Sequence, residues 1–237
     1  MKICRSRLVA LAFVAIPGTS LAQGGTIVGT VRYAAAEPEA RVIAVTKNQD
    51  TCGETLLSKQ LMVVGGRVQY AVVHVEGAKG KTMPEHVTLM NHDCSFDPPI
   101  IAATAKSIVE IGNQDPILHN THLRQRRRTL ANLALPHQGD KIQNSRALRR
   151  PGIVDVECDT HGWMTAKILV FDHPYFSVSD QAGRFTIVDV PPGTYTVKVW
   201  HEILGELDES VTVTAGATTA ADFLFGVKTV SGNKGER

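Results

Sequence analysis

The chain has 237 residues, of which 43% are hydrophobic, 20% charged and 5% aromatic, and its formal net charge is +2. A charge this close to zero excludes a strongly basic protein of the kind that coats nucleic acid. The sequence also contains no helical repeat, coiled-coil heptad or low-complexity tract, which excludes solenoid and fibrous architectures.

The first residues predict an export signal. Lys2, Arg5 and Arg7 precede a short apolar run at 8–16, and small residues at 20–22 form a cleavage site. The apolar run is too short to span a bilayer, and no later stretch is long enough. We therefore expect a signal peptide at 1–22 and a mature protein that is exported to the periplasm without a membrane span.

Short β-branched runs bounded by turn-forming residues follow one another along the mature chain, which predicts an all-β protein built of β-sandwiches. One segment, 128–135, is instead expected to form a short helix. The expected strands are Ile27–Tyr33, Arg41–Val45, Leu61–Val64, Val68–Val75, His86–Met90, Ser107–Ile111, Ile153–Glu157 and Ala166–Phe171.

The chemistry concentrates in residues 158–164, where Cys158, His161 and Met164 are spaced as Cys-x-x-His-x-x-Met. A soft thiolate, imidazoles and a weak thioether together suit a mononuclear copper better than other metals. Zinc is the nearest rival, but it has little use for a thioether, and no second cysteine lies nearby. The second imidazole is expected from the segment 113–122, in which His119 and His122 are both candidates.

These motifs resemble the cupredoxins, the small blue copper proteins, and especially their amicyanin branch. The resemblance implies a Greek-key β-sandwich with His119, Cys158 and His161 as equatorial ligands of one type 1 copper and Met164 as the axial ligand. It also implies that Asn120 joins the two ligand loops by a hydrogen bond near the sulfur. The amicyanin loop carries prolines beside its histidine, whereas Thr160 and Gly162 flank His161 here.

Three cysteines remain once the signal is removed, namely Cys52, Cys94 and Cys158. Unpaired thiols are a liability in an oxidising compartment. If Cys158 binds the metal, Cys52 and Cys94 are left as a disulfide pair, which is a hypothesis because sequence alone does not fix the pairing.

A basic stretch, 123–150, joins the two ligand loops. It carries eight lysines and arginines against a single acid, among them Arg124, Arg126, Arg127 and Arg128. Because both ends of the stretch adjoin ligand loops, we expect its charge to lie near the metal and to attract an acidic redox partner such as a cytochrome. The alternative is that this stretch is an ordinary solvent-exposed loop without a docking role. Nucleic acid is not expected as a partner.

After residue 172 the sequence pattern changes. A Ser-Asp-x-x-Gly-x-Phe hairpin motif at 179–185 is followed by Pro-x-Gly-x-Tyr. This resembles the carboxypeptidase regulatory-like (transthyretin-like) module and implies a second, small β-sandwich. We expect a copper domain at 23–172, the second module at 173–228 and a flexible tail at 229–237. The strand containing Gly29 also resembles the first strand of that module, so the copper domain is alternatively an insertion.

The combination of both modules resembles exported bacterial proteins loosely described as methylamine-utilisation proteins. The leading hypothesis is one-electron transfer, with His161 at the loop surface as the route to a redox protein partner. The alternatives are a copper carrier or storage protein and an adhesion or carbohydrate-binding module. Enzymatic activity is not expected, because the sequence lacks the His-x-His pairs of a second, catalytic copper.

Overall fold

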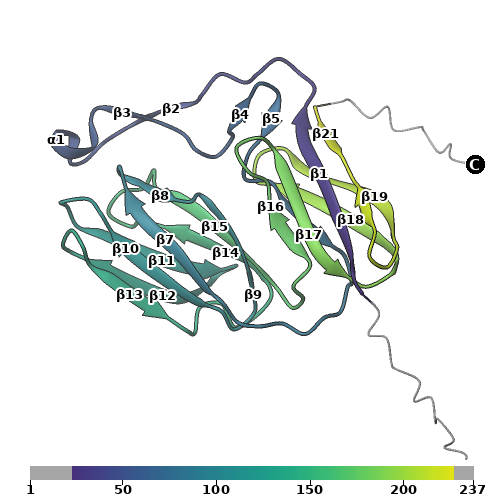
Figure 1. The fold of residues 1–237 in the computed structure, drawn as a ribbon. Helices are drawn as coiled ribbons and strands as arrows, with labels where there is room; N and C mark the ends of the chain where they lie inside the picture. The colour runs from purple at the N-terminus through teal and green to yellow at the C-terminus, as the bar shows by residue number, and fades with distance from the viewer. Residues whose placement is uncertain (1–22, 227–237) are drawn as a thin grey trace, which may run out of the picture.

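The computed structural model describes residues 23–226. The predicted signal peptide at 1–22 and the predicted tail at 229–237 lie outside the described residues. Among the described residues the chain is all-β apart from one four-residue helix, α1 (Gln49–Cys52), and it forms two β-sandwiches side by side (Figure 1). The predicted fold class is confirmed.

The first sandwich has a four-stranded and a five-stranded sheet. The four-stranded sheet has the order β13 (Lys141–Asn144), β10 (Ile108–Asn113), β7 (His86–His92) and β8 (Ser95–Asp97). The five-stranded sheet has the order β12 (Arg128–Leu135), β11 (His119–Gln125), β14 (Gly152–Glu157), β15 (Thr165–Phe171) and β9 (Ile100–Thr104). Two pairs, β7 with β10 and β9 with β15, run parallel, and the other neighbours are antiparallel.

The second sandwich combines strands from both ends of the described chain. One sheet has β1 (Gly25–Tyr33) at its centre, paired with β17 (Arg184–Val190), β20 (Thr218–Ala220), β21 (Phe223–Phe225) and β5 (Arg67–Val68), which pairs with β4 (Val63–Val64). The other has the order β16 (Phe176–Val178), β6 (Val72–Val75), β18 (Gly193–His201) and β19 (Gly205–Val213). A separate ribbon joins β2 (Val42–Ala44) to β3 (Thr55–Leu57).

The packing therefore differs from the predicted division at residues 172 and 173. Strands β1, β4, β5 and β6 belong to the second sandwich, and the first sandwich is inserted between β6 and β16, which is the alternative that the Gly29 strand suggested. Gly29 shows why this strand fits there, because a Cβ at this position would lie 1.8 Å from the carbonyl oxygen of Ala221. Only glycine allows the backbones to approach this closely.

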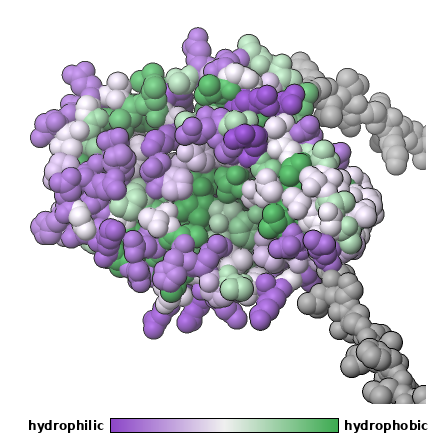
Figure 2. Space-filling model, in the orientation of Figure 1, coloured by the Kyte–Doolittle hydropathy of each residue, from purple (hydrophilic) through white to green (hydrophobic). Residues whose placement is uncertain are grey.

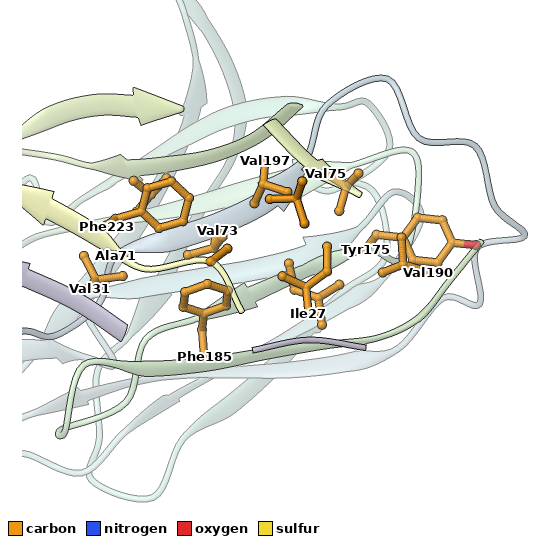
Figure 3. Packing of buried hydrophobic residues seen from close by; sticks show 14 of the residues in the cluster. Ile27, Val31, Ala71, Val73, Val75, Tyr175, Phe185, Val190, Val197 and Phe223 are labelled. Carbon is orange, nitrogen blue, oxygen red and sulfur yellow. The ribbon is translucent and has the colours of Figure 1, made fainter. Parts of the chain in front are cut away.

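Each sandwich has its own core. In the second sandwich Ile27 and Val31 of β1 pack with Val73, Val197 and other apolar residues from both sheets (Figure 3). Phe185 and Phe223 belong to the same core. A smaller apolar cluster, centred on Val72, Ile100 and Leu169 and including Tyr70, Phe171, Val178 and Trp200, joins the two sandwiches. Apolar residues also gather where the sandwiches meet on the face seen in Figure 2.

The expected helix at 128–135 is wrong, since these residues form strand β12. Seven residue pairs register β12 against β11, and Arg126 takes a positive φ of 56° in the turn between them. The ladder of backbone hydrogen bonds to a buried neighbour outweighs the helix propensity of the leucines and alanines. Within residues 23–226 no helix has the length and apolarity needed to cross a membrane.

Buried histidines of the second sandwich should make its stability depend on pH. Burial lowers the pKa of His201 to about 4, and its Nδ1 accepts hydrogen bonds from the backbone N–H groups of Ile203 and Leu204. The folded pKa lies below the unfolded value of 6.5, so this contribution is complete above pH 6.5 and is lost as the pH falls towards 4. His74, whose pKa burial also lowers to about 4, adds to the same trend.

We predict that His201→Asn, which keeps a hydrogen-bond acceptor but does not titrate, flattens the pH dependence. Between pH 7 and pH 4 the metal-free variant should lose up to about 3 kcal/mol less stability than the wild type, since each pKa unit is worth ~1.4 kcal/mol. Urea unfolding at each pH measures this loss. The control is His86→Asn, at an exposed position of the first sandwich, and parallel curves for all three proteins would refute the assignment.

Candidate metal centre

The two predicted ligand loops meet at one end of the five-stranded sheet. His119 begins β11, while Cys158 follows β14 directly, and these two strands pair with His122 opposite Glu157. Antiparallel neighbours bring the start of one strand beside the end of the other. The fold thus places His119 next to the 158–164 loop although Cys158 is 39 positions further along the chain.

Three donor atoms converge there. The Nδ1 atoms of His119 and His161 are 3.1 Å apart, and Cys158 Sγ lies 3.7 Å from His161 Nδ1. All three donors lie within 4.8 Å of one another, and all three residues are buried. Metal bonds of ~2.0 Å to nitrogen and ~2.3 Å to sulfur hold ligand atoms ~3.3–3.8 Å apart, so the cluster has the dimensions of a site for one small metal ion.

The outer nitrogen of each imidazole is fixed by an oxygen. His119 Nε2 lies 2.9 Å from Asp115 Oδ2, and His161 Nε2 lies 2.9 Å from Asn48 Oδ1. A carboxylate and an amide oxygen accept hydrogen bonds, so each Nε2 carries the proton and each Nδ1 presents its lone pair to the cluster. The tautomers are therefore set for metal binding through Nδ1.

Asp115 is itself held in place. Its carboxylate accepts hydrogen bonds from the backbone N–H groups of Asp93 and Cys94, each at 2.9 Å. Burial acts to raise the pKa of Asp115, but the hydrogen bonds with His119 and with Cys94 outweigh it and lower the pKa. The side chain is consequently a carboxylate at neutral pH. The sequence did not predict a role for Asp115. The signal that could have indicated one is an acidic residue four positions before His119.

The surroundings also shift the pKa values of the three donor residues. Burial acts to raise the pKa of the Cys158 thiol, but hydrogen bonding with His119 and with the loop outweighs it, so the pKa is lowered towards the thiolate form. Burial acts to lower the pKa of His119, but Asp115 and Cys158 raise it more. Burial, followed by the charges of His119 and Lys47, lowers the pKa of His161 to about 4 and keeps this imidazole neutral.

Asn120 occupies the position between the loops that the resemblance implied. Its Oδ1 accepts hydrogen bonds from the Cys158 thiol at 3.4 Å and from the Thr160 backbone N–H at 3.2 Å. Its Nδ2 donates to Asp159 Oδ2 at 3.0 Å and to Asn132 Oδ1 at 2.9 Å. The side chain thus connects β11, β12 and the ligand loop around the sulfur.

Met164 closes the ligand loop. Its backbone N–H donates to the His161 carbonyl at 2.9 Å, and its carbonyl accepts from the Cys158 N–H at 3.3 Å. The side chain is 2% exposed and packs in the same apolar cluster as Cys158. This placement puts Met164 in the same loop as Cys158 and His161, and its role as an axial ligand stays a prediction.

His122, the alternative to His119, is occupied elsewhere. Its Nδ1 lies 2.9 Å from Asp159 Oδ1, and its Nε2 lies 2.9 Å from Thr129 Oγ1 and accepts from Arg124 Nε at 3.2 Å. It is not part of the cluster of three donors. The structure therefore favours His119 as the upstream donor. A second group, Cys94 with Asp115 and His119, offers no thiolate because Cys94 is in a disulfide.

His161 is not at the surface, in contrast to the expectation. Its exposed fraction is 0%, because a covering segment, β2–α1–β3 (Val42–Leu57), lies over it. The predicted disulfide between Cys52 and Cys94 is present and fastens this segment to the turn before β8. Val45, Leu56 and Trp163 complete a small apolar cluster around the disulfide. In Figure 1, α1 lies at the end of the first sandwich, far from β1 and β4.

The basic residues are not near the metal centre, again in contrast to the expectation. Arg126 and Arg127 form the turn between β11 and β12, with Arg124 and Arg128 beside it, at the opposite end of β11 from His119. Six residue steps at ~3.3 Å each put about 20 Å between that turn and His119. Both ends of the basic stretch do adjoin the ligand loops, but the intervening hairpin carries the arginines away.

Residues 153–221 match the protein family described as Polysaccharide lyase family 4, domain II, over less than a third of the chain. The match begins in β14 of the first sandwich and ends in the second. Its description differs from the carboxypeptidase regulatory-like module that the hairpin motif indicates, and that resemblance stays a prediction. Among curated proteins, none matches this chain in sequence.

Several solved structures are similar to part of the chain. A copper-containing nitrite reductase from Thermus scotoductus is 19% identical with a TM-score of 0.31, over 47% of this chain and 25% of that one. Auracyanin A from Chloroflexus aurantiacus is 14% identical with a TM-score of 0.32, and the match covers 38% of this chain and 100% of auracyanin A. An amicyanin variant is 17% identical with a TM-score of 0.28, and the match covers 42% of this chain and 98% of the amicyanin. This chain thus spans a quarter of the nitrite reductase that it matches.

We predict that the covering segment controls access to Cys158, which would be the single free thiol of the mature chain. In metal-free Cys52→Ala/Cys94→Ala protein, alkylation of Cys158 by iodoacetamide should be about tenfold faster, which corresponds to ~1.4 kcal/mol less protection. Mass spectrometry measures the rate. The control is unfolded protein of both types, where the rates should coincide, and equal rates in the folded proteins would contradict the role of the disulfide.

Proposed function

We propose that this chain is a periplasmic electron-transfer protein with one mononuclear type 1 copper, and that it is not an enzyme. The observation that carries the proposal is the buried convergence of His119 Nδ1, His161 Nδ1 and Cys158 Sγ, with both outer nitrogens already bonded. The donor set supports copper over zinc, because a single thiolate beside two imidazoles and a nearby methionine suits a trigonal copper site.

A copper ion in such a site supplies reversible one-electron chemistry between its two oxidation states. The residues of this chain contribute rigidity. Asp115 and Asn48 fix the two imidazole planes, and Asn120 fixes the loop around Cys158. A donor set that is held from outside changes little when its charge changes, which keeps the reorganisation accompanying electron transfer small.

The proposed partner is a redox protein that contacts the end of the first sandwich where the ligand loops meet. Since Asn48 covers His161, an electron reaching this imidazole crosses the covering segment. The arginines near residue 126 lie about 20 Å away along β11 and do not support docking of an acidic cytochrome beside the ligands.

A second candidate, a copper carrier or store, is favoured by the burial of His161 behind a disulfide-fastened segment. The two functions differ in what leaves the protein. An electron-transfer protein should be reduced by ascorbate and reoxidised by ferricyanide many times without loss of copper. A carrier should release Cu(I) to a chelator faster than it exchanges electrons, and stopped-flow absorbance with copper analysis separates the two.

We predict an intense thiolate-to-copper absorption band that bleaches on reduction, and its loss in Cys158→Ser, because a hydroxyl does not replace the soft thiolate. His119→Ala and His161→Ala should weaken copper binding by at least about tenfold, since each removes one of three strong donors. The matched control is His122→Ala, which should keep the band. Loss of the band in His122→Ala with retention in His119→Ala would show that the upstream donor is His122.

We predict that Met164→Leu keeps copper and the thiolate band but shifts the reduction potential, because the axial bond is weak and tunes the potential. Leucine conserves most of the volume in the buried cluster, so stability should change by less than ~1.5 kcal/mol. Protein-film or spectroelectrochemical titration measures the potential. An unchanged potential would exclude the thioether from the site.

A further inference from the structure

A cleft of about 900 Å³ opens at the end of the first sandwich away from the metal centre, between the two sandwiches. One side is the β11–β12 turn with Arg126 and Arg128, and another is the loop before β14 with Arg146, Arg149 and Arg150. Leu130 and Ile153 also line the cleft, as does Trp200 from the second sandwich. This volume is in the range of small-ligand sites, ~300–1,000 Å³.

The five arginines of the cleft have no acidic partner within the described part of the chain. Among residues 23–226 the arginines found in ion pairs are Arg124 and Arg184, neither of which lines the cleft. The acid that does line it, Asp155, binds Lys167 at 2.7 Å, and Lys167 also contacts Glu202 at 3.5 Å. One lysine against these two carboxylates leaves a single net negative charge, which is far less than the positive charge of the five guanidinium groups.

Five guanidinium groups without ion-pair partners around one concavity repel one another, and an anion with several charges relieves that repulsion. Guanidinium groups bind carboxylates and phosphates through two parallel hydrogen bonds, which gives both strength and direction. Since these arginines are exposed, they can turn towards a ligand without losing existing partners. The charge pattern therefore identifies an oligoanion as the class of ligand.

The apolar residues that line the cleft indicate which kind of oligoanion fits it. Ile153 is 39% exposed, and it lines the cleft together with Leu130 and the half-buried ring of Trp200. Sugar rings have apolar faces that pack against such surfaces, whereas a polyphosphate chain has none. We propose that this cleft binds an acidic oligosaccharide, with its carboxylates on the arginines and its ring faces on Trp200 and Ile153.

This site is separate from the metal centre. Gly152, which lines the cleft, is at the start of β14, and Cys158 follows the end of that strand. The six steps from Gly152 to Cys158 span about 20 Å. Ligand binding should therefore leave the thiolate band unchanged, and the site stands whether or not the proposed electron transfer is correct.

The test is calorimetric titration of the purified protein with oligogalacturonates of three to six units, at several salt concentrations. Binding should weaken as salt rises, because exposed charges are screened. The double variant Arg128→Glu/Arg149→Glu should lose at least about tenfold in affinity, since two bidentate contacts become repulsive. The matched control is Arg127→Glu, in the same turn but outside the cleft, which should change affinity less than about threefold.

Indole N–H signals in NMR spectra of the diamagnetic protein locate the ligand. Trp200 should shift on titration while Trp163, at the metal end, should not. Neutral maltohexaose should produce no shift. The proposal is overturned if Arg127→Glu and the double variant lose affinity equally, which would indicate unspecific attraction. It is also overturned if tripolyphosphate binds as tightly as the sugar without moving Trp200, or if only an acidic protein binds.

Discussion

The antiparallel pairing of β11 with β14 is the constraint on which the candidate metal centre depends. It places His119 at the start of one strand beside Cys158 at the end of the other, and every further contact of the site builds on that meeting. Asn120 can bond to the thiol and to Thr160 because the same pairing brings its strand to the loop. A shift of one residue in this register would turn His119 and Leu123 to the opposite face, so the buried Leu123 also fixes the position of the donor.

Rigidity at the site comes from outside the ligand loops. Asp115 holds His119 from the segment before β11, while Asn48 holds His161 from a segment that leaves and re-enters the other sandwich. Asn48 has a φ of 53°, a left-handed conformation that asparagine tolerates better than most residues. Its amide oxygen lies 2.9 Å from His161 Nε2, and the disulfide four residues later fastens the same segment to the first sandwich. Two distant parts of the chain thus set the two tautomers.

Local sequence was sufficient for features that depend on residue type and short spacing. The Cys-x-x-His-x-x-Met loop, the alternating strands and the disulfide left over by elimination could all be predicted. Contacts made across long separations could not be predicted: Asn48 and His161 are 113 positions apart, and no local pattern links them. The expected position of the arginines near the metal was wrong for a related reason. Chain connectivity fixed only the two ends of the basic stretch, and the length of β11 and β12 places Arg126 far from the ligands.

The covering segment links the two sandwiches in a way that their shared apolar cluster does not. It starts after β1 and returns to β4, both in the second sandwich, yet its middle is fastened to the first by Cys52–Cys94 and by Asn48. A change in the relative position of the sandwiches therefore strains the segment that covers His161. The cleft with the arginines lies at the other side of the same junction, lined by Trp200 from the second sandwich. A ligand there restrains the junction from one side and the disulfide restrains it from the other. Both restraints act on the junction between the sandwiches, whereas the donor side chains are held by their own contacts with Asp115, Asn48 and Asn120.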